Sequence, residues 1–473
     1  MSDTAAVSTA PHHQPSAKDI RLVIAASSAG TVFEWYDFFI YGTLAAIIGT
    51  AFVPSDNDLV RQLVVWAGFA VGFGFRPLGA VLFGFLGDRL GRKYTFLVTV
   101  TLMGVATAGV GLVPSVETIG LAAPAIIIFL RILQGLALGG EYGGAAIYVA
   151  EHSPPGKRGF YTGFIQASVV GGFVLSLVVV LACKAAMPAD VWTEWGWRVP
   201  FLLSIILLGI SLWMRVRLSE SPVFQAMKEA GETAQNPFKE SFTYPGNKRR
   251  IFIALFGIAA GLTVIWYTAM FSGLTFLTGP MRMEETPAQI VVGSAAMVGM
   301  VFFVWAGALS DRVGRKKPIV WGYLITLVLL FPCFWVMGSV LEPLHAGAAD
   351  GAKVMPDAIG VAVIFLALLT LSALSGATYG PVAALLSEMF PPRIRYSSMS
   401  IPYHIGTGYF GGFLPLIATA IVAETGDPYS GLWYTFAVVA GALAVAWWGL
   451  ADGPPRDFIE ESTEARPVSP ALA

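Results

Sequence analysis

Long stretches of the chain contain no charged residue, and this feature constrains the fold more than any other. Five such runs reach the roughly 20 residues needed to cross the hydrocarbon core of a membrane: 94–116, 159–183, 251–281, 318–341 and 358–387. Backbone groups in hydrocarbon find no water to hydrogen-bond, so such segments cross a membrane as helices. The sequence therefore predicts an all-α membrane protein.

Composition agrees with this class. Hydrophobic residues make up 56% of the chain and charged residues only 12%, whereas soluble domains carry about 25% charged residues. Segmentation at clusters of Gly, Pro and charge predicts twelve transmembrane helices, near 22–50, 61–86, 94–113, 120–148, 159–183, 198–214, 251–278, 288–309, 318–341, 358–386, 396–423 and 429–450. The polar segments 1–20 and 452–473 are expected to be disordered tails.

The loops between these helices differ in charge. Lys and Arg gather after the second, fourth, sixth, eighth and tenth helices, for example at 89–93, 157–158 and 312–317. Because cytoplasmic loops are enriched in Lys and Arg, both termini are predicted to face the cytoplasm.

Several classes of function are disfavoured. The net charge of −1 argues against a nucleic-acid partner. Cys183 and Cys333 lie far apart in apolar runs, so neither a disulfide nor a metal site is expected. His345 and His404 lack catalytic partners and the sequence has no phosphate-binding Gly-rich motif, so neither an enzyme nor a cofactor is expected.

The chain repeats itself. GFLGDRLGRK (84–93) matches GALSDRVGRK (307–316) at seven of ten positions with an offset of 223, and EHSPPGKR (151–158) matches EMFPPRIR (388–395) with an offset of 237. This parallel duplication predicts two pseudo-symmetric six-helix halves around a central cavity. The halves are 21–214 and 251–451, joined by a cytoplasmic linker at 215–250.

Three further stretches narrow the interpretation: FEWYDFFIYG (33–42), FRPLGAVLFGFLGDRLGRK (75–93) and RILQGLALGGEYGGA (131–145). With the doubled loop, they resemble the major facilitator superfamily and, within it, the metabolite:proton symporter family. The resemblance covers almost the whole chain. It implies a monomer in the lipid bilayer of the bacterial inner membrane that carries a small molecule such as citrate, 2-oxoglutarate, shikimate, or proline and betaine.

Charges of the repeated loops are candidates for closing the cytoplasmic side. In the family that the chain resembles, the loop Asp lies near the amino end of a helix of the other half, where the helix dipole favours an anion. The resemblance assigns these gating roles to Asp88, Arg89, Arg92, Glu151, Asp311, Arg312, Arg315 and Glu388. The alternative is that the charges only fix the topology.

Five ionisable residues are predicted to lie inside the first half: Glu34, Asp37, Arg76, Arg131 and Glu141. Each intramembrane charge costs about 2.5–3.5 kcal/mol, so the five are expected to pair. The set contains two cations and three acids, so one carboxylate has no cation to pair with. That carboxylate is the expected proton carrier. We therefore expect Glu34, Asp37, Arg131 and Glu141 to serve proton coupling, with a static packing network as the alternative.

Candidate cargo-binding residues come from both halves. Arg76 is the first, because a guanidinium binds a carboxylate through two hydrogen bonds. The spans of the second half contain almost no ionisable residue except His404 and offer aromatic side chains instead. The full set is Tyr36, Tyr41, Arg76, Gln134, Gln166, Trp266, Tyr267, Tyr379, Tyr403 and His404. For the aromatic members, packing or anchoring at the membrane interface is the alternative.

Together these features favour a proton-coupled symporter that imports a small polar metabolite, an organic acid or a zwitterion, by alternating access. A proton-coupled efflux antiporter would share the fold and the buried acids, but the fifth helix (GFIQASVVGGFVLS, 163–176) lacks the proline typical of that group. A membrane sensor would need a longer soluble domain than either tail provides.

Overall fold

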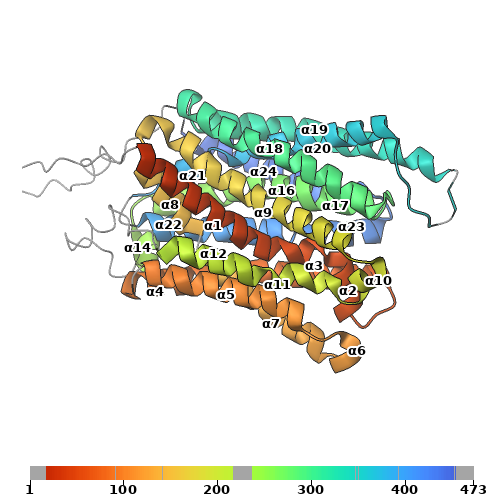
Figure 1. Cartoon of the computed structure of the whole chain (residues 1–473). Helices are drawn as coiled ribbons and strands as arrows, with labels where there is room; N and C mark the ends of the chain where they lie inside the picture. The colour runs from red at the N-terminus through yellow and green to blue at the C-terminus, as the bar shows by residue number, and fades with distance from the viewer. Residues whose placement is uncertain are drawn as a thin grey trace, which may run out of the picture.

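A computed structural model describes residues 17–90, 92–140, 142–216, 237–346, 348–349, 351–391, 394–451 and 453. Over these residues the protein is a bundle of long helices (Figure 1). Ten of the described helical stretches are long and apolar enough to cross a membrane, and a helix pair bent by 62° forms an eleventh span. A shorter apolar helix, Leu97–Leu112, takes the place of the third predicted span. The all-α membrane fold is confirmed, and each of the twelve predicted spans has a helical counterpart.

The first half runs from α1 to α12. Its spans are α1 (Ala17–Thr43) with α2 (Ala45–Phe52), α3 (Asp58–Gly74) with α4 (Arg76–Leu90), α5 (Arg92–Leu112), α7 (Ala122–Gly139) with α8 (Tyr142–His152), α9 (Arg158–Ala186), and α11 (Val199–Leu202) with α12 (Ser204–Val216). They are connected by α6 (Val116–Ile119), α10 (Ala189–Glu194) and the 3-10 turns η1 (Pro155–Lys157) and η2 (Gly196–Arg198).

The second half follows the linker helix α14 (Pro237–Thr243). Its seventh span joins α15 (Asn247–Phe252), η3 (Ile253–Ala259), α16 (Ala260–Tyr267), η4 (Thr268–Ser272) and α17 (Gly273–Thr278). The remaining spans are α18 (Glu285–Val313), α19 (Lys316–His345), α20 (Ala358–Tyr379) with α21 (Val382–Met389), α22 (Arg395–Ile405) with η5 (Gly406–Gly412) and α23 (Leu414–Thr425), and α24 (Leu432–Gly449).

The seventh span starts at Asn247, earlier than the expected position 251. The Asn247 side chain is buried there and donates hydrogen bonds to the Ser241 carbonyl oxygen at 2.7 Å and to Ser398 Oγ at 2.9 Å. These bonds attach the end of the linker to α22. In addition η3, η4 and η5 are π-helical, a rare conformation that is frequent at functional sites.

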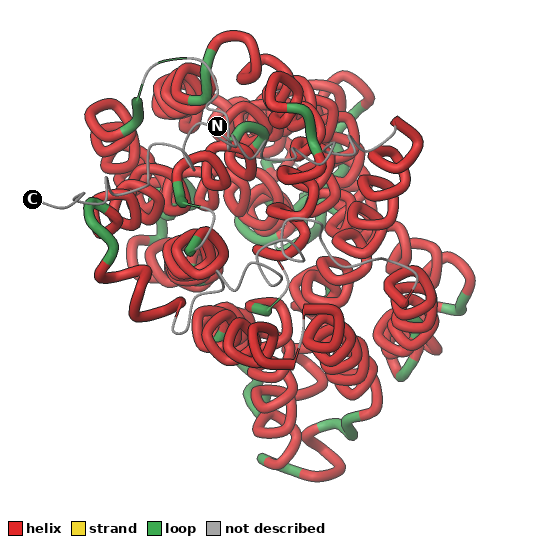
Figure 2. The backbone as a smooth tube through the Cα atoms, turned by 90° about the vertical axis from the view of Figure 1, so that its left-hand side faces the viewer, coloured by secondary structure: helices red, strands yellow, loops and turns green. Residues whose placement is uncertain are grey.

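The bundle has two ends (Figure 1). One carries the α8–α9 and α18–α19 connections and is named the latch end; the other carries α2, α10 and the α23–α24 connection and is named the far end. Helix α1 starts at the latch end, and Gly453, which follows α24, lies against Gly314 of the α18–α19 connection. Figure 2 views the bundle from the latch end, with most helices seen end-on.

Glycines allow the helix backbones to touch at two places that position the site. A Cβ at Gly135 of α7 would collide with the Gly72 carbonyl oxygen of α3, so the close approach predicted for the fourth span is present. Between the halves, a Cβ at Gly159 of α9 would collide with the Gly307 carbonyl oxygen of α18. Small residues at such contacts let membrane helices pack closely.

Candidate functional site

Arg76 lies between the two halves. It is the first residue of α4, after a break in the second span at Phe75, and its side chain is fully buried. Its Nη1 donates a hydrogen bond to Thr407 Oγ1 of η5, in the second half, at 3.2 Å. Its guanidinium carbon is 5.2 Å from the ring centre of Trp35 and 5.2 Å from that of Phe73, which is a favourable cation–π arrangement.

Aromatic residues of the second half share this buried layer. Tyr267, Tyr379 and His404 are close enough to Arg76 for its charge to act on each of them. The hydroxyls of Tyr379 and Tyr403 hydrogen-bond at 3.2 Å, and the rings of Tyr403 and His404 are 5.7 Å apart. The fold therefore gathers four of the predicted cargo-binding residues of the second half near Arg76.

Further rings pack across the halves on the far-end side of Arg76. Phe39 stacks on Trp266 at 5.0 Å, Tyr267 stacks on Phe271 at 5.8 Å, and Phe73 meets Tyr267 edge-on at 5.5 Å. We name this group the aromatic seal: Phe39, Phe69, Phe73, Phe173, Trp266, Tyr267 and Phe271. Only Trp266 and Tyr267 of this group were predicted from the sequence. The helical spacing of Phe69 and Phe73 in α3 was an available signal for those two residues.

Arg131 is bound within the first half. Its Nη1 donates to the Phe38 carbonyl oxygen at 3.3 Å and to Gln134 Oε1 at 2.7 Å. Its guanidinium carbon lies 4.1 Å from the ring centre of Phe38 and 4.5 Å from that of Tyr41. The expected pairing of Arg131 with an acid is wrong for the described carboxylates, because backbone oxygen and aromatic faces meet the guanidinium instead. Gln134 Nε2 in turn donates to Thr107 Oγ1 at 2.7 Å.

The two acids of α1 are buried in the first half. Glu34 is 6% exposed and Asp37 is 5% exposed. Trp35, which lies between them in the sequence, is the residue that contacts the Arg76 guanidinium. Glu141, the third expected acid, lies outside the described residues. The proton-coupling role of this group stays a prediction.

Two other candidates lie within the first half. The Tyr36 hydroxyl donates a hydrogen bond to the Pro200 carbonyl oxygen of α11 at 2.6 Å. Because α1 and α11 both belong to the first half, this position does not support the expected contact of Tyr36 with cargo. Gln166 of α9 is fully buried.

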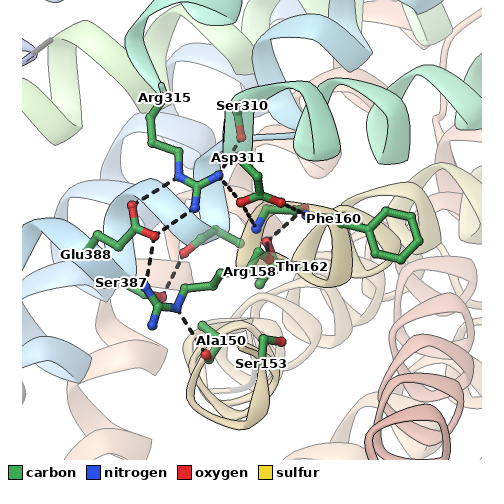
Figure 3. Close-up of polar contacts among 12 residues, drawn as sticks. Ala150, Ser153, Arg158, Phe160, Thr162, Ser310, Asp311, Arg315, Ser387 and Glu388 are labelled. Atoms are coloured by element: carbon green, nitrogen blue, oxygen red, sulfur yellow. Dashed lines mark hydrogen bonds and ion pairs between the residues drawn. The ribbon is translucent and has the colours of Figure 1, made fainter. Parts of the chain in front are cut away.

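Glu388 connects the halves at the latch end (Figure 3). It accepts hydrogen bonds from Arg315 Nε at 3.0 Å and Arg315 Nη2 at 2.8 Å, and a third from Arg158 Nη1 at 3.0 Å. Arg158 belongs to α9 of the first half, whereas Arg315 and Glu388 belong to the second. All three side chains are at most 6% exposed, so this is a buried ion cluster.

Asp311 adds a second connection. Its two carboxylate oxygens accept hydrogen bonds from the backbone N–H groups of Gly159 and Phe160, each at 2.8 Å, at the amino end of α9. Arg315 Nη1 also donates to Asp311 Oδ1 at 2.7 Å. The carboxylate thus meets the positive end of a helix dipole of the other half, as the resemblance implied.

The surroundings of Arg315 keep it charged. Burial lowers its pKa, but the hydrogen bonds and charge of Glu388 and the charge and hydrogen bond of Asp311 outweigh burial, so the pKa is raised above its usual value. A raised pKa means that the stabilising charge is fully present at every pH below the pKa of an arginine in the unfolded chain. Arg315 therefore does not titrate at physiological pH.

A third connection uses the other repeated segment. Arg395 Nη1 of the second half lies 3.3 Å from Glu151 Oε1 of the first. In the aligned repeats, Glu151 corresponds to Glu388 and Arg158 to Arg395. Each glutamate therefore pairs with the arginine of the opposite half. Arg158 was missed as a gating residue, although its alignment with Arg395 was a usable signal.

Two groups of gating candidates stay outside these contacts. Arg312 is exposed and forms no ion pair with a described residue. The side chains of Asp88, Arg89 and Arg92 are not among the described ones, so their roles stay predictions. We name the contacts of Arg158, Asp311, Arg315, Glu388, Glu151 and Arg395 the latch.

Two helical halves that meet around a buried polar layer and close at one end define a transporter of the major facilitator class. The match to solved structures agrees: the proton:xylose symporter XylE bound to 6-bromo-6-deoxy-D-glucose superposes with a TM-score of 0.72 at 18% identity, covering 94% of this chain and 98% of that one. At this identity the likeness shows the fold alone.

Sequence comparison identifies the family. The family model described as "Sugar (and other) transporter" matches residues 22–253 and 239–449, so the chain belongs to that family. The proline/betaine transporter of Salmonella typhimurium is 32% identical over 90% of this chain and 82% of its own length. The citrate-proton symporter of Salmonella typhi is 31% identical over 89% and 92%. The protein is a multi-pass membrane transporter of small molecules and not an enzyme.

Proposed function

We propose that the protein is a proton-coupled symporter that imports a small organic acid or zwitterion by alternating access. It works as a single chain in the bacterial inner membrane, with the latch end and both termini in the cytoplasm and the proton as the coupling ion. The names of the citrate and proline/betaine relatives support cargo of this kind.

One observation carries the proposal. The turn of α1 that holds the buried carboxyl groups of Glu34 and Asp37 contacts, through Trp35, a buried guanidinium that joins the halves. Intramembrane acids of this kind mark ion and proton pathways. Burial favours the neutral form of a carboxyl group, so such a group binds a proton when the cavity closes and releases it when water enters.

Arg76 is the proposed anchor for cargo. A carboxylate can replace Thr407 as the acceptor and bind the guanidinium through two hydrogen bonds. Tyr267, Tyr379, Tyr403 and His404 then form the wall on the side of the second half. Trp266 and the rest of the aromatic seal cover the layer toward the far end.

The latch supplies the alternation. While it is formed, the cytoplasmic side is closed and cargo enters from the far end. Once cargo and a proton are bound, the two halves rotate relative to each other and the latch contacts separate. The cargo and the proton then leave into the cytoplasm. Asp88, Arg89 and Arg92 are proposed to act in the first half as Asp311 and Arg315 do in the second.

Uptake into proteoliposomes tests this function. With proline, glycine betaine, shikimate and citrate as labelled cargo, an inward proton gradient should drive accumulation of at least one, and an uncoupler should abolish it. Uptake that does not depend on the proton gradient would exclude proton symport. Export driven by the gradient would favour the efflux antiporter.

Matched variants then locate the proton site. Glu34→Gln or Asp37→Asn should reduce gradient-driven accumulation at least about tenfold, the effect of about 1.4 kcal/mol, while exchange of cargo across the membrane continues. Glu117→Gln, an exposed acid, is the control. Normal accumulation in both variants would show that neither Glu34 nor Asp37 is the proton site.

A further inference from the structure

The second half contacts the break in the second span through η5. This π-helical segment has the sequence GTGYFGG over Gly406–Gly412. A Cβ at Gly408 would lie 2.9 Å from the Phe73 carbonyl oxygen, and a Cβ at Gly412 would collide with the Phe73 ring. The glycines therefore let the backbone of η5 lie directly against the end of α3, just before the break at Phe75.

Two side chains of η5 bind the two sides of this break. The Tyr409 hydroxyl donates a hydrogen bond to the Gly74 carbonyl oxygen, before the break, at 3.1 Å. Thr407 Oγ1 accepts a hydrogen bond from Arg76 Nη1, after the break, at 3.2 Å. Both bonds join the second half to the first. The bond of Thr407 is the buried one, because Thr407 is 2% exposed and Arg76 is fully buried.

The Thr407 hydroxyl faces the guanidinium as an acceptor. Its single hydrogen is donated to the Tyr403 carbonyl oxygen, one turn earlier in α22, at 2.8 Å, so the lone pairs of Oγ1 are directed to Arg76. This oxygen is uncharged. A hydrogen bond between a guanidinium and a carboxylate is charged on both sides and is therefore stronger than the bond to Thr407.

We propose that Thr407 is a positioning residue for Arg76 and that it competes with the carboxylate of the cargo for the guanidinium. Without cargo, the hydroxyl holds an N–H group of Arg76 that the carboxylate takes over on binding. Part of the binding free energy of the cargo is then used to break a bond between the halves. Thr407 thereby sets the affinity for cargo. This inference rests on the proposed function for the role of Arg76 as the anchor of a carboxylate.

Ligand-induced thermal stabilisation of the purified protein measures this competition without transport. The probes are glycine betaine, proline, shikimate and citrate. Thr407→Val keeps a branched side chain and removes the acceptor. The half-maximal concentration of a probe that stabilises the unchanged protein should therefore fall at least about threefold, a conservative fraction of the effect of one hydrogen bond to a charged group. Thr407→Ser keeps the hydroxyl and should give the original value.

The direction of the change separates competition from structural damage, because a variant that only disturbs packing binds more weakly. Tyr409→Phe is the matched control: it removes the neighbouring bond between the halves without touching Arg76, so its binding should be unchanged. Equal or weaker binding in Thr407→Val overturns the proposal, and so does equally tightened binding in Tyr409→Phe. Thr407→Ala, which also lacks the hydroxyl, takes the place of Thr407→Val in this comparison if the valine variant does not fold.

Arg76→Gln separates this inference from the proposed function. Binding weakened at least about tenfold in Arg76→Gln, with no gain in Thr407→Val, would exclude only the competition. Normal binding in Arg76→Gln would exclude the carboxylate anchor of the proposed function, and this inference with it. The same conclusion would follow if none of the four probes stabilised the unchanged protein.

Discussion

At the scale of single residues, Glu388 binds two buried arginines that belong to different halves. Its carboxylate binds Arg315 through two hydrogen bonds and Arg158 through one, with all three side chains shielded from solvent. Removing one partner of a buried ion pair costs about 3–5 kcal/mol, because the other charge stays behind. The closed latch should therefore be far more sensitive to Glu388 than to an exposed acid.

Glu388→Gln is expected to shift the protein toward the state open at the latch end. A cysteine at Ser387, fully buried beside the latch, reports this in a background without Cys183 and Cys333. Its maleimide labelling should rise at least about tenfold, a conservative fraction of the pair energy. Glu424→Gln, at an exposed position, is the control. Equal labelling in both variants would show that the cluster does not hold the latch closed.

At the scale of elements, the contact between α9 and α18 depends on missing side chains. Gly159 and Gly307 face each other so closely that a Cβ on either would collide with the other's carbonyl oxygen. This contact lies beside the Asp311 bonds to the amino end of α9. The Gly159–Gly307 contact and the latch are therefore expected to form and separate together.

Gly159→Ala should prevent the latch from closing fully. Labelling of a cysteine at Ser387 should increase, as in Glu388→Gln, although no charge is lost. Gly209→Ala is the matched control, because no atom lies within 4 Å of a Cβ built there. In α12 that change should be neutral or stabilising by up to about 1 kcal/mol, the difference in helix propensity. If Gly159→Ala labels like the unchanged protein, the glycine contact does not limit closure.

The elements also show what the sequence could predict. The uncharged runs and the loop charges predicted the spans, because a backbone in hydrocarbon must satisfy its hydrogen bonds within a helix. The duplicated segments pointed to Glu151, Asp311 and Glu388. The rotation of each helix about its own axis could not be predicted from the sequence. Arg131 therefore meets Phe38 and Tyr41 rather than a described acid. The π-helical segments were also missed, since they depend on packing between spans.

At the scale of the whole molecule, α9 and α18 connect the halves at both ends. Beyond the latch, Lys184 Nζ lies 3.7 Å from Glu285 Oε2 and donates to Thr286 Oγ1 at 3.2 Å. Gln289 Nε2 donates to Glu285 Oε1 at 3.4 Å from the next turn of α18. Because Lys184 and Glu285 belong to different halves, opening at the far end separates them.

Lys184→Gln should therefore favour the state open at the far end. The side chains are about one-third exposed (34% and 37%), so the pair is partly screened and the expected shift is about two- to fivefold. A cysteine at Ser272, which lines a cavity of about 240 Å³ near the far end, reports the opening through its labelling rate. The charge-reversed double variant Lys184→Glu/Glu285→Lys should restore the original rate. Arg61→Gln removes an ion pair inside the first half and should leave the rate unchanged. An equal effect of Lys184→Gln and Arg61→Gln would mean that surface charge, and not contact between the halves, sets the far-end opening.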